Sequence, residues 1–269
     1  MMERVNNSLQ ALSLPSLGRV GSGVWSMEAV TDCDITVEAG CDVSLLLFDG
    51  DATAEVNIDV ECGAKLRILH VVNHKSATTL AIAVAEGAEC RMTQVVCSSS
   101  DSRVVASLVG RDARFEMGGV FVLTDDDQTS VTADVNHMSA DCVSRIKVKG
   151  VASGKSHGRF SGLVYVAPDA QRTDSEQTNR NVTIGEGHIE TLPQLEIYAD
   201  DVKCSHGATV GQMDSDAILY MRQRGLSLVD AKRLQIEGFV DDVVLHSAIE
   251  GEVITETLTA LLAEKLNKL

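Results

Sequence analysis

Four copies of one short pattern follow each other through the first half of the chain. Each copy is a turn residue, a small residue and then alternating polar and apolar positions, and the copies begin at Gly40, Gly63, Gly87 and Asp112. The steps between them are 23, 24 and 25 residues, and a looser fifth copy begins at Asp141. Such alternation is typical of a short, half-buried strand. A single unit of this kind cannot bury its apolar side, so successive units have to stack on each other.

This period indicates a solenoid with several short strands in each coil. Equivalent positions are expected to stack on one interior face at a strand spacing of about 4.8 Å; they are Val43, Leu66, Cys90 and Phe115. Leucine-rich repeats have a similar period, but their pattern of Leu and Asn is missing. Connections between parallel strands of one sheet are right-handed in nearly all proteins. We therefore predict a mainly-β fold, a right-handed parallel β-helix that occupies residues 31–212.

Both ends of the chain differ from the repeats. Residues 1–30 are expected to form an N-terminal lead-in, and residues 213–269 a C-terminal helical region. Asp214 or Ser215 can cap a first helix, and Ser227 can cap a second. Apolar residues recur at helical spacing further on, which predicts a third helix between residues 253 and 266. These helices are expected to cap the open end of the solenoid.

Composition and charge narrow the class of protein. The 269 residues carry a formal net charge of −16, and an acidic surface repels the phosphates of nucleic acids and anionic lipids. Seven cysteines without a Cys-x-x-Cys pair argue against a disulfide framework and for a reducing compartment. No signal peptide is visible, and no apolar run is long enough to span a bilayer. We therefore expect a cytoplasmic protein without nucleic-acid or membrane partners.

A cysteine and a histidine two residues apart are the first candidates for chemistry. Cys204 and His206 lie in a strand-like segment, and residues i and i+2 of a strand project from the same face. A thiolate and an imidazole that point together suit soft metals and iron–sulfur chemistry. Cysteine and histidine are also common core residues, so the pair alone is a weak signal.

The sequence around this pair is far more specific. It reads Pro193-Gln-Leu-Glu-Ile-Tyr-Ala-Asp-Asp-Val-Lys-Cys-Ser-His-Gly-Ala-Thr209 and is followed by Tyr220-Met-Arg-Gln-Arg-Gly225. Upstream lie Gly162-Leu-Val-Tyr-Val-Ala and Arg172-Thr-Asp-Ser-Glu-Gln-Thr-Asn179. These segments resemble the SufD branch of the SufB/SufD family of the SUF iron–sulfur cluster assembly system. The resemblance is dense from about Gly162 to Phe239.

The resemblance implies a β-helix core with a helical C-terminal region, which agrees with the repeat. It also implies a non-catalytic component of a cluster assembly scaffold. Members of the SufD branch pair with a SufB paralogue through their β-helices, and each C-terminal region docks a SufC ATPase. The chain itself has no Walker lysine, so it is not expected to bind nucleotide.

The resemblance also implies roles for single residues. His206 matches a histidine that lies at the SufB–SufD interface and is implicated in nascent cluster formation, with Cys204 beside it. The expected cargo is iron or a transient iron–sulfur cluster, which can be absent from the isolated protein. The SufB paralogue carries a cysteine where this chain has Gly187 and His188, so a thiolate would have to come from a partner. His188 is a secondary candidate for the same site.

Two surfaces are expected to bind partners. The strand from Gln194 to Ala199 is expected to pair with another chain, and a homodimer is expected when the protein is purified alone; its alternating residues are Leu195, Ile197 and Ala199. The ATPase contact is expected on the helices after residue 213, through Leu219, Arg222, Arg224, Leu226 and Phe239. The alternative is that these five side chains only pack against the β-helix.

One departure and two alternatives remain open at this stage. Family members usually carry a helical N-terminal domain that is not seen here, so the chain is expected to be a short homologue or a fragment. It can be a stand-alone homodimeric scaffold that combines the SufB and SufD roles. It can also be a β-helix enzyme acting on polysaccharide, although such sites need paired carboxylates and aromatic sugar platforms. A single Trp (Trp25) and three Tyr disfavour that enzyme.

The remaining motifs are expected to be structural. His70 and His74 are too far apart along a strand to share a metal and are expected at the surface or in a turn. The run Asp125-Asp-Asp127 lacks the alternating ligands of a calcium loop and is expected to be a solvated turn. Three cysteines are expected as small core residues, namely Cys41, Cys90 and Cys142. The other three outside the Cys204 motif are expected near coil corners, namely Cys33, Cys62 and Cys97.

Overall fold

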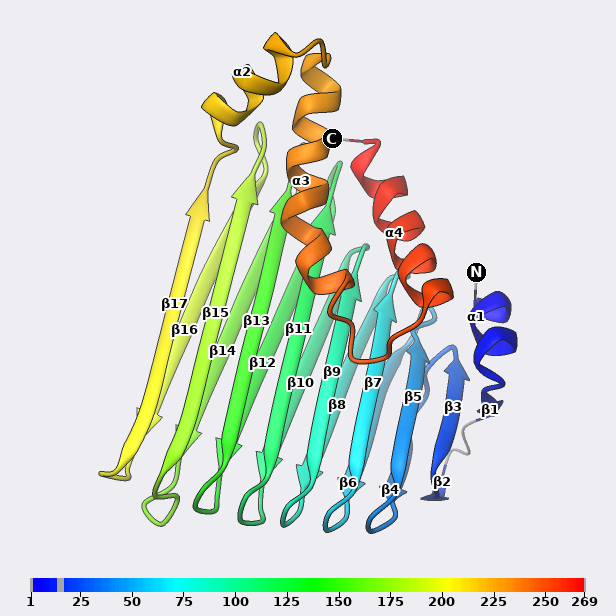
Figure 1. Ribbon diagram of the computed structural model, residues 1–269, viewed down its shortest axis with the longest axis vertical. Coiled ribbons are helices and arrows are strands. Elements are labelled where there is room, and N and C mark those ends of the chain that lie inside the picture. Colours follow the sequence, from blue (N-terminus) through cyan, green and yellow to red (C-terminus); the bar gives the residue numbers. More distant parts are fainter. Residues whose placement is uncertain (1, 14–16, 269) are drawn as a thin grey trace.

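The computed structural model describes residues 2–13 and 17–268, which form a flattened solenoid followed by helices (Figure 1). Parallel strands build two sheets, here called the odd sheet and the even sheet after the numbers of their strands. The odd sheet contains, in spatial order, β1 (Leu12–Ser13), β3 (Gly23–Glu28), β5 (Asp42–Phe48), β7 (Lys65–Val72), β9 (Glu89–Val96), β11 (Arg114–Leu123), β13 (Val143–Ala152), β15 (Thr173–Thr183) and β17 (Val202–Gly211). The even sheet contains β2 (Leu17–Val20), β4 (Cys33–Val37), β6 (Thr53–Val60), β8 (Ser76–Val84), β10 (Ser100–Leu108), β12 (Gln128–His137), β14 (His157–Val166) and β16 (His188–Ile197).

Neighbouring coils stack in register along both sheets. The stacking that the repeat predicts is confirmed, because β5, β7, β9 and β11 pair through Val43, Leu66, Cys90 and Phe115 in this order. The prediction of a mainly-β fold, a parallel β-helix followed by a helical region, is confirmed as well. The segment expected as a lead-in, residues 1–30, contributes β2 and β3, and both are hydrogen-bonded into the sheets.

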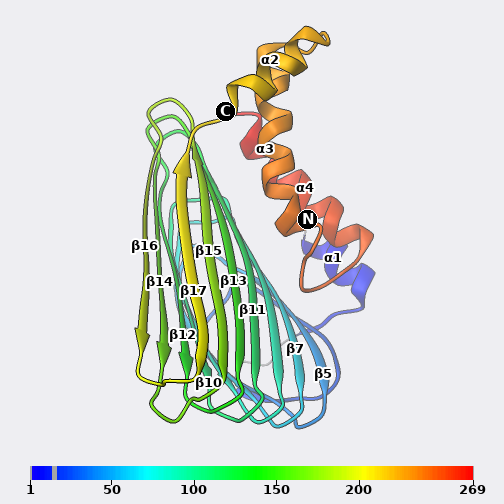
Figure 2. The same ribbon diagram turned by 60° about the vertical axis from the view of Figure 1, so that its left-hand side comes forward.

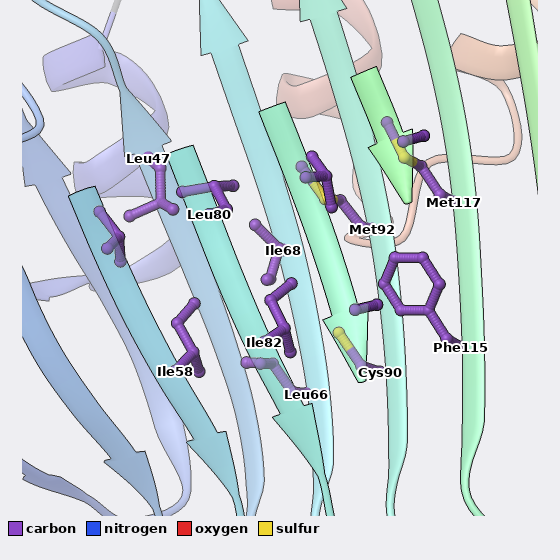
Figure 3. Close-up of a cluster of buried hydrophobic side chains, with 14 of the residues drawn as sticks. Leu47, Ile58, Leu66, Ile68, Leu80, Ile82, Cys90, Met92, Phe115 and Met117 are labelled. Carbon is purple, nitrogen blue, oxygen red and sulfur yellow. The ribbon is translucent and has the colours of Figure 1, made fainter. Parts of the chain in front are cut away.

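Aliphatic side chains of the two sheets meet between them and form the main core. Figure 3 shows Leu66 and Ile68 of the odd sheet beside Leu80 and Ile82 of the even sheet. Burying such a side chain contributes about 1.5–3 kcal/mol relative to leaving it exposed. Alternate residues of every strand point into this space, which explains the period of two in the repeats.

The turn that begins each copy of the repeat needs a left-handed backbone. Gly40, Gly63 and Gly87 have φ angles of 69°, 66° and 63°, and Asp112 and Asp141 take the same conformation at 59° and 64°. Glycine adopts these angles without a Cβ clash, and aspartate tolerates them better than most residues do. The choice of Gly or Asp at the start of each copy is therefore set by the turn.

The described helices are α1 (Met2–Leu9), α2 (Ser215–Gln223), α3 (Leu228–Val244) and α4 (Glu252–Leu266), and Asp214 and Ser227 cap α2 and α3 as predicted. The prediction that the C-terminal helices cap the open end of the solenoid is wrong. Instead α1, α3 and α4 lie on the outer face of the odd sheet (Figure 2), where Leu46 and Leu69 share one apolar cluster with Val240. Strands buried on both faces lose their alternation, so the run of residues 45–48 in β5 is apolar throughout.

Ion pairs fasten these helices to the solenoid. Asp242 of α3 lies 2.6 Å from Lys147 Nζ and 2.9 Å from Lys149 Nζ, both on β13. The segment Asp125–Asp127, expected to be a solvated turn, instead contacts α4, because Asp127 lies 2.6 Å from Lys265 Nζ. None of the described helices combines the length and the hydrophobicity that a membrane crossing requires.

Candidate functional site

The last coil, formed by β16 and β17, has a free edge on each of its strands. Within the described residues β16 pairs only with β14, and β17 only with β15. The backbone N–H groups of His188 and Tyr198 donate toward β14, to the carbonyl oxygens of Ser156, just before this strand, and of Val166, at its end. Because alternate residues of a strand direct their backbone groups to opposite sides, those of Leu195 and Ile197 face the free edge of β16. Unpaired groups of this kind are a ready template for another strand.

Cys204 and His206 lie on β17 at this edge. Their side chains point to the interior side of the strand, where Cys204 follows Ser175 and His206 follows Gln177 in the register with β15. Cys204 is half-buried against an apolar cluster that includes Leu195, whereas His206 is exposed. A thiol and an imidazole therefore meet solvent together where the interior of the solenoid opens.

The thiol of Cys204 holds its proton more firmly than a free cysteine does. Burial is the main cause that raises its pKa, and the carboxylate of Asp174 adds to the rise, whereas a hydrogen bond from the Ser175 backbone opposes it. The thiolate is the form that binds metals and attacks electrophiles. A metal bound by Cys204 therefore has to displace this proton.

The interior beneath this pair is lined by buried polar side chains. Ser144 and Ser175 replace the apolar residues of one stacked column, and their hydroxyl oxygens lie 2.7 Å apart. The Nε2 atom of His137 lies 2.9 Å from the Ser144 hydroxyl. Polar side chains continue along β15 in buried positions, at Gln177, Asn179 and Asn181. Sequence reasoning missed this interior, and the only signal was the period-two run of Ser, Gln, Asn and Asn from residue 175.

Gln177 is the most constrained of these buried groups. Its amide nitrogen donates to the carbonyl oxygen of Gly162 on the opposite sheet at 3.2 Å, while its Oε1 atom is buried without a partner. A Cβ at Gly162 would lie only 2.5 Å from that nitrogen, so the glycine makes room for the amide. A buried acceptor without a donor costs about 1–3 kcal/mol. The chain thus keeps an unsatisfied acceptor directly below His206.

The other candidates for the cluster site are not brought together with this pair. His188 points outward from the start of β16, so the sheet separates it from Cys204 and His206. Among the described residues, no three or more His, Cys, Asp and Glu side chains are grouped so that they could hold a metal ion. Any metal bound by Cys204 and His206 would need further ligands from another molecule.

The residues expected to bind partners fall into two groups. Leu195 and Ile197 line the open interior of the last coil, whereas Ala199 is buried in the turn after β16. Leu219, Arg222 and Arg224 of the α2 region are exposed, and Leu226 is half-buried. Phe239 instead packs on the odd sheet, where Lys149 Nζ lies 4.9 Å from its ring centroid.

The remaining histidines and cysteines have structural surroundings. The expectation of a surface or turn position is wrong for His70, which is fully buried and lies 2.8 Å from Asp49 Oδ1, whereas His74 is exposed. Cys90 and Cys142 are buried, as expected of core residues. Cys41 is half-buried; Cys33 and Cys97 are buried, and Cys62 is exposed.

Three known proteins show what the chain resembles. It is 41% identical over 133 residues to the iron–sulfur cluster assembly protein SufD of Escherichia coli, a match that covers 49% of this chain and 31% of that protein. A SufBD family protein of Synechocystis is 45% identical over 86 residues, which cover 32% of this chain and 19% of the relative. A SufBD family protein of Mycobacterium leprae is 30% identical over 238 residues, which cover 81% and 59% of the two chains.

These relatives are longer than the present chain, which spans less than two thirds of each. The model of the SufBD core domain of the SUF iron–sulfur cluster assembly system matches residues 27–239, which include the end of β3, the solenoid from β4 onward, α2 and most of α3. The match also includes both edge strands and the Cys204–His206 pair. The chain therefore belongs to the SufBD core family, and it is similar to SufD-type members of that family.

Proposed function

We propose that the chain is a non-catalytic component of a scaffold that assembles iron–sulfur clusters. Membership of the SufBD family supports this role. The observation that carries it is the open last coil, where Cys204 and His206 lie side by side at an edge strand above a polar interior. Iron or the nascent cluster is cargo in this proposal, and it leaves for a client protein.

His206 is the principal ligand in this proposal. It is exposed, and a neutral imidazole binds iron while its protonation favours release. Cys204 would be the softer ligand, but burial raises the pKa of its thiol, so it acts after a metal has displaced the proton. The missing ligands come from a partner chain that pairs with the free edge.

Complementation of a strain that depends on the SUF system tests this role. The His206→Ala variant is expected to fold and to bind partners, yet to mature iron–sulfur enzymes poorly. His74→Ala is the matched control, because His74 is exposed elsewhere on the solenoid. Normal maturation by His206→Ala would make His206 a structural residue and remove the basis of the proposal.

The partner at the free edge is a SufB-like paralogue or a second copy of this chain. Both edge strands of the last coil have unpaired backbone groups, and those of Leu195 and Ile197 face outward from β16. Strand pairing there would bring a second chain beside His206. A chain purified alone is expected to form a homodimer through the same edge.

A pair of proline variants tests the edge. Ile197→Pro removes an N–H that β14 does not use, so the fold is expected to survive while association is lost. Glu196→Pro removes an N–H on the β14 side of the same strand and is expected to destabilise the solenoid itself. Size determination with and without the SufB paralogue reads out both. If Ile197→Pro still forms dimers, the interface lies elsewhere on the molecule. If the wild type does not bind SufB, a stand-alone homodimeric scaffold is favoured.

The second partner is a SufC-type ATPase, which we place on α2 and the turn before α3. Leu219, Arg222 and Arg224 are exposed there, so they are free to make contacts. Phe239 is left out of the contact because it packs on the odd sheet. Leu219→Glu combined with Arg222→Glu is expected to abolish SufC binding. Leu245→Glu, at an equally exposed position beyond α3, is the control, and equal loss in both variants would refute the assignment.

A further inference from the structure

A pair of histidines lies on the outer face of the even sheet, away from Cys204 and His206. His157 and His188 occupy paired positions at the starts of β14 and β16, and both are exposed. Their ring centroids are 5.4 Å apart and their planes are inclined by 54°. Each side chain follows a turn and has solvent on one side, so its ring can rotate without disturbing the core.

This separation fits a metal ion held between the two rings. A zinc–nitrogen bond of about 2.0–2.1 Å places the metal about 3.2 Å from the centroid of each imidazole ring. If the angle between the two zinc–nitrogen bonds is tetrahedral, the two centroids are about 5.2 Å apart. The observed 5.4 Å differs from that value by less than the movement of an exposed side chain. Two imidazoles presented from paired positions of neighbouring strands therefore have the spacing of a metal clamp.

The surroundings favour a cation over an anion. The two rings line a shallow depression of about 350 Å³ together with the carboxylates of Asp101 and Glu190. The Oε1 atom of Glu190 lies 3.9 Å from Nε2 of His188, close enough to orient that ring once it rotates. Arg159 is the one guanidinium in the lining, and it pairs in register with Glu190, which offsets its charge.

We infer that His157 and His188 bind a divalent transition metal of the zinc class, with water molecules as the remaining ligands. Imidazole suits zinc, copper, nickel and iron, whereas magnesium and calcium prefer oxygen ligands. Two protein ligands make a weaker and more exchangeable site than the four ligands of a structural zinc centre. The site is separate from the cluster site proposed above, and neither requires the other.

Zinc titration of the full-length chain tests this inference, with a chromophoric chelator as the competitor. The wild type is expected to bind one zinc ion. His157→Ala and His188→Ala are each expected to lower the affinity for that ion by at least about 10-fold. Glu190→Gln is expected to weaken binding by about 10-fold through loss of the orienting carboxylate. Arg159→Ala is expected to strengthen it, because a nearby positive charge is removed.

Two further variants separate this site from other exposed ligands. Zinc affinity is expected to be unchanged in His74→Ala and Cys62→Ser, since these residues lie elsewhere on the solenoid. Thermal unfolding without zinc checks that the surface substitutions leave the fold intact. Unchanged zinc affinity in His157→Ala or His188→Ala, or a loss of affinity in either control variant, would overturn the inference.

Discussion

Gln177 and His206 occupy neighbouring positions of one inward-facing column, and the amide oxygen of Gln177 is buried without a hydrogen-bond donor. The amide is fixed at its other end by the carbonyl oxygen of Gly162. This unsatisfied oxygen lowers the stability of the fold and lies below a candidate ligand. A role in the function of the site therefore explains it better than a role in folding.

Replacing Gln177 by Leu is expected to separate the effect of this residue on stability from its effect on the function of the site. The change removes the unsatisfied acceptor together with one hydrogen bond of ordinary strength, so the free energy of unfolding is expected to change by no more than about 1 kcal/mol. Cluster assembly and the NMR chemical shifts of the His206 ring are both expected to change. A loss of several kcal/mol in a denaturant titration would instead assign Gln177 to the core alone.

The space at Gly162 provides a second prediction. A methyl group there would collide with the Gln177 amide and with the carbonyl oxygen of Ala133, at 2.5 and 3.1 Å. Gly162→Ala is therefore expected to lower the free energy of unfolding by about 1–3 kcal/mol. Gly238→Ala is the matched control, because α3 leaves open space around that position and alanine is the better helix former by up to about 1 kcal/mol. Equal effects in denaturant unfolding would show that the Gly162 position tolerates a side chain.

His137 predicts a loss of stability in mild acid. Burial lowers the pKa of His137 from 6.5 to about 4, so the folded chain keeps this ring neutral. The unfolded chain binds more protons between these two values, and stability therefore falls as the pH drops from 6.5 to 4, by about 3 kcal/mol from this residue. His137→Gln is expected to remove that part of the pH dependence, while His74→Gln retains it. Parallel pH profiles of wild type and His137→Gln would contradict the prediction.

The attachment of α3 offers a fourth test, because two neighbouring aspartates have opposite surroundings. Hydrogen bonds from Lys147 and Lys149 lower the pKa of Asp242 to about 2, whereas burial raises the pKa of Asp241. Asp242→Asn is expected to reduce the free energy of unfolding at pH 7 by about 0.5–1 kcal/mol, a value that allows for solvent screening. Asp241→Asn is expected to leave it unchanged or slightly higher.

The same pair of variants has a predicted pH dependence. The contribution of the Asp242 carboxylate is present above its unfolded pKa of 3.8 and is lost as the pH falls through its folded pKa of about 2, below which the carboxylate is protonated in both states. The difference between wild type and Asp242→Asn is therefore expected to shrink steadily as the pH falls toward that value in chemical unfolding. A difference that persists there would point to packing rather than charge.

The repeat made the solenoid predictable because each coil is specified locally. A glycine at position 63 or 87 sets the turn, and the alternation after it decides which side chains stack. The position of α3 and α4 was not predictable in the same way. Leu46 and Leu69 lie in runs that are apolar on both faces, and such a run does not reveal whether a helix or another sheet covers its outer side.

The candidate site was predictable only in part, for a related reason. The spacing of Cys204 and His206 was enough to place them on one face of a strand. Around Gln177 and Asn179, however, β15 is polar on both faces, so the sequence pattern does not show which face of this strand points into the interior. His157 escaped notice because its partner on β16 is 31 residues away in the sequence, and only the register of the coils brings them together.

The strands of the solenoid lengthen along the chain, from 7 residues in β5 to 11 in β15, so the molecule is a wedge with one narrow and one wide end. Two copies cannot join narrow end to wide end without leaving strand positions unmatched, which discourages the head-to-tail contacts that build open filaments. The wide end would match another wide end of similar perimeter. In the dimer proposed above, pairing there would close the assembly at two subunits, so the lengthening of successive coils would protect a protein with exposed strand edges against polymerisation.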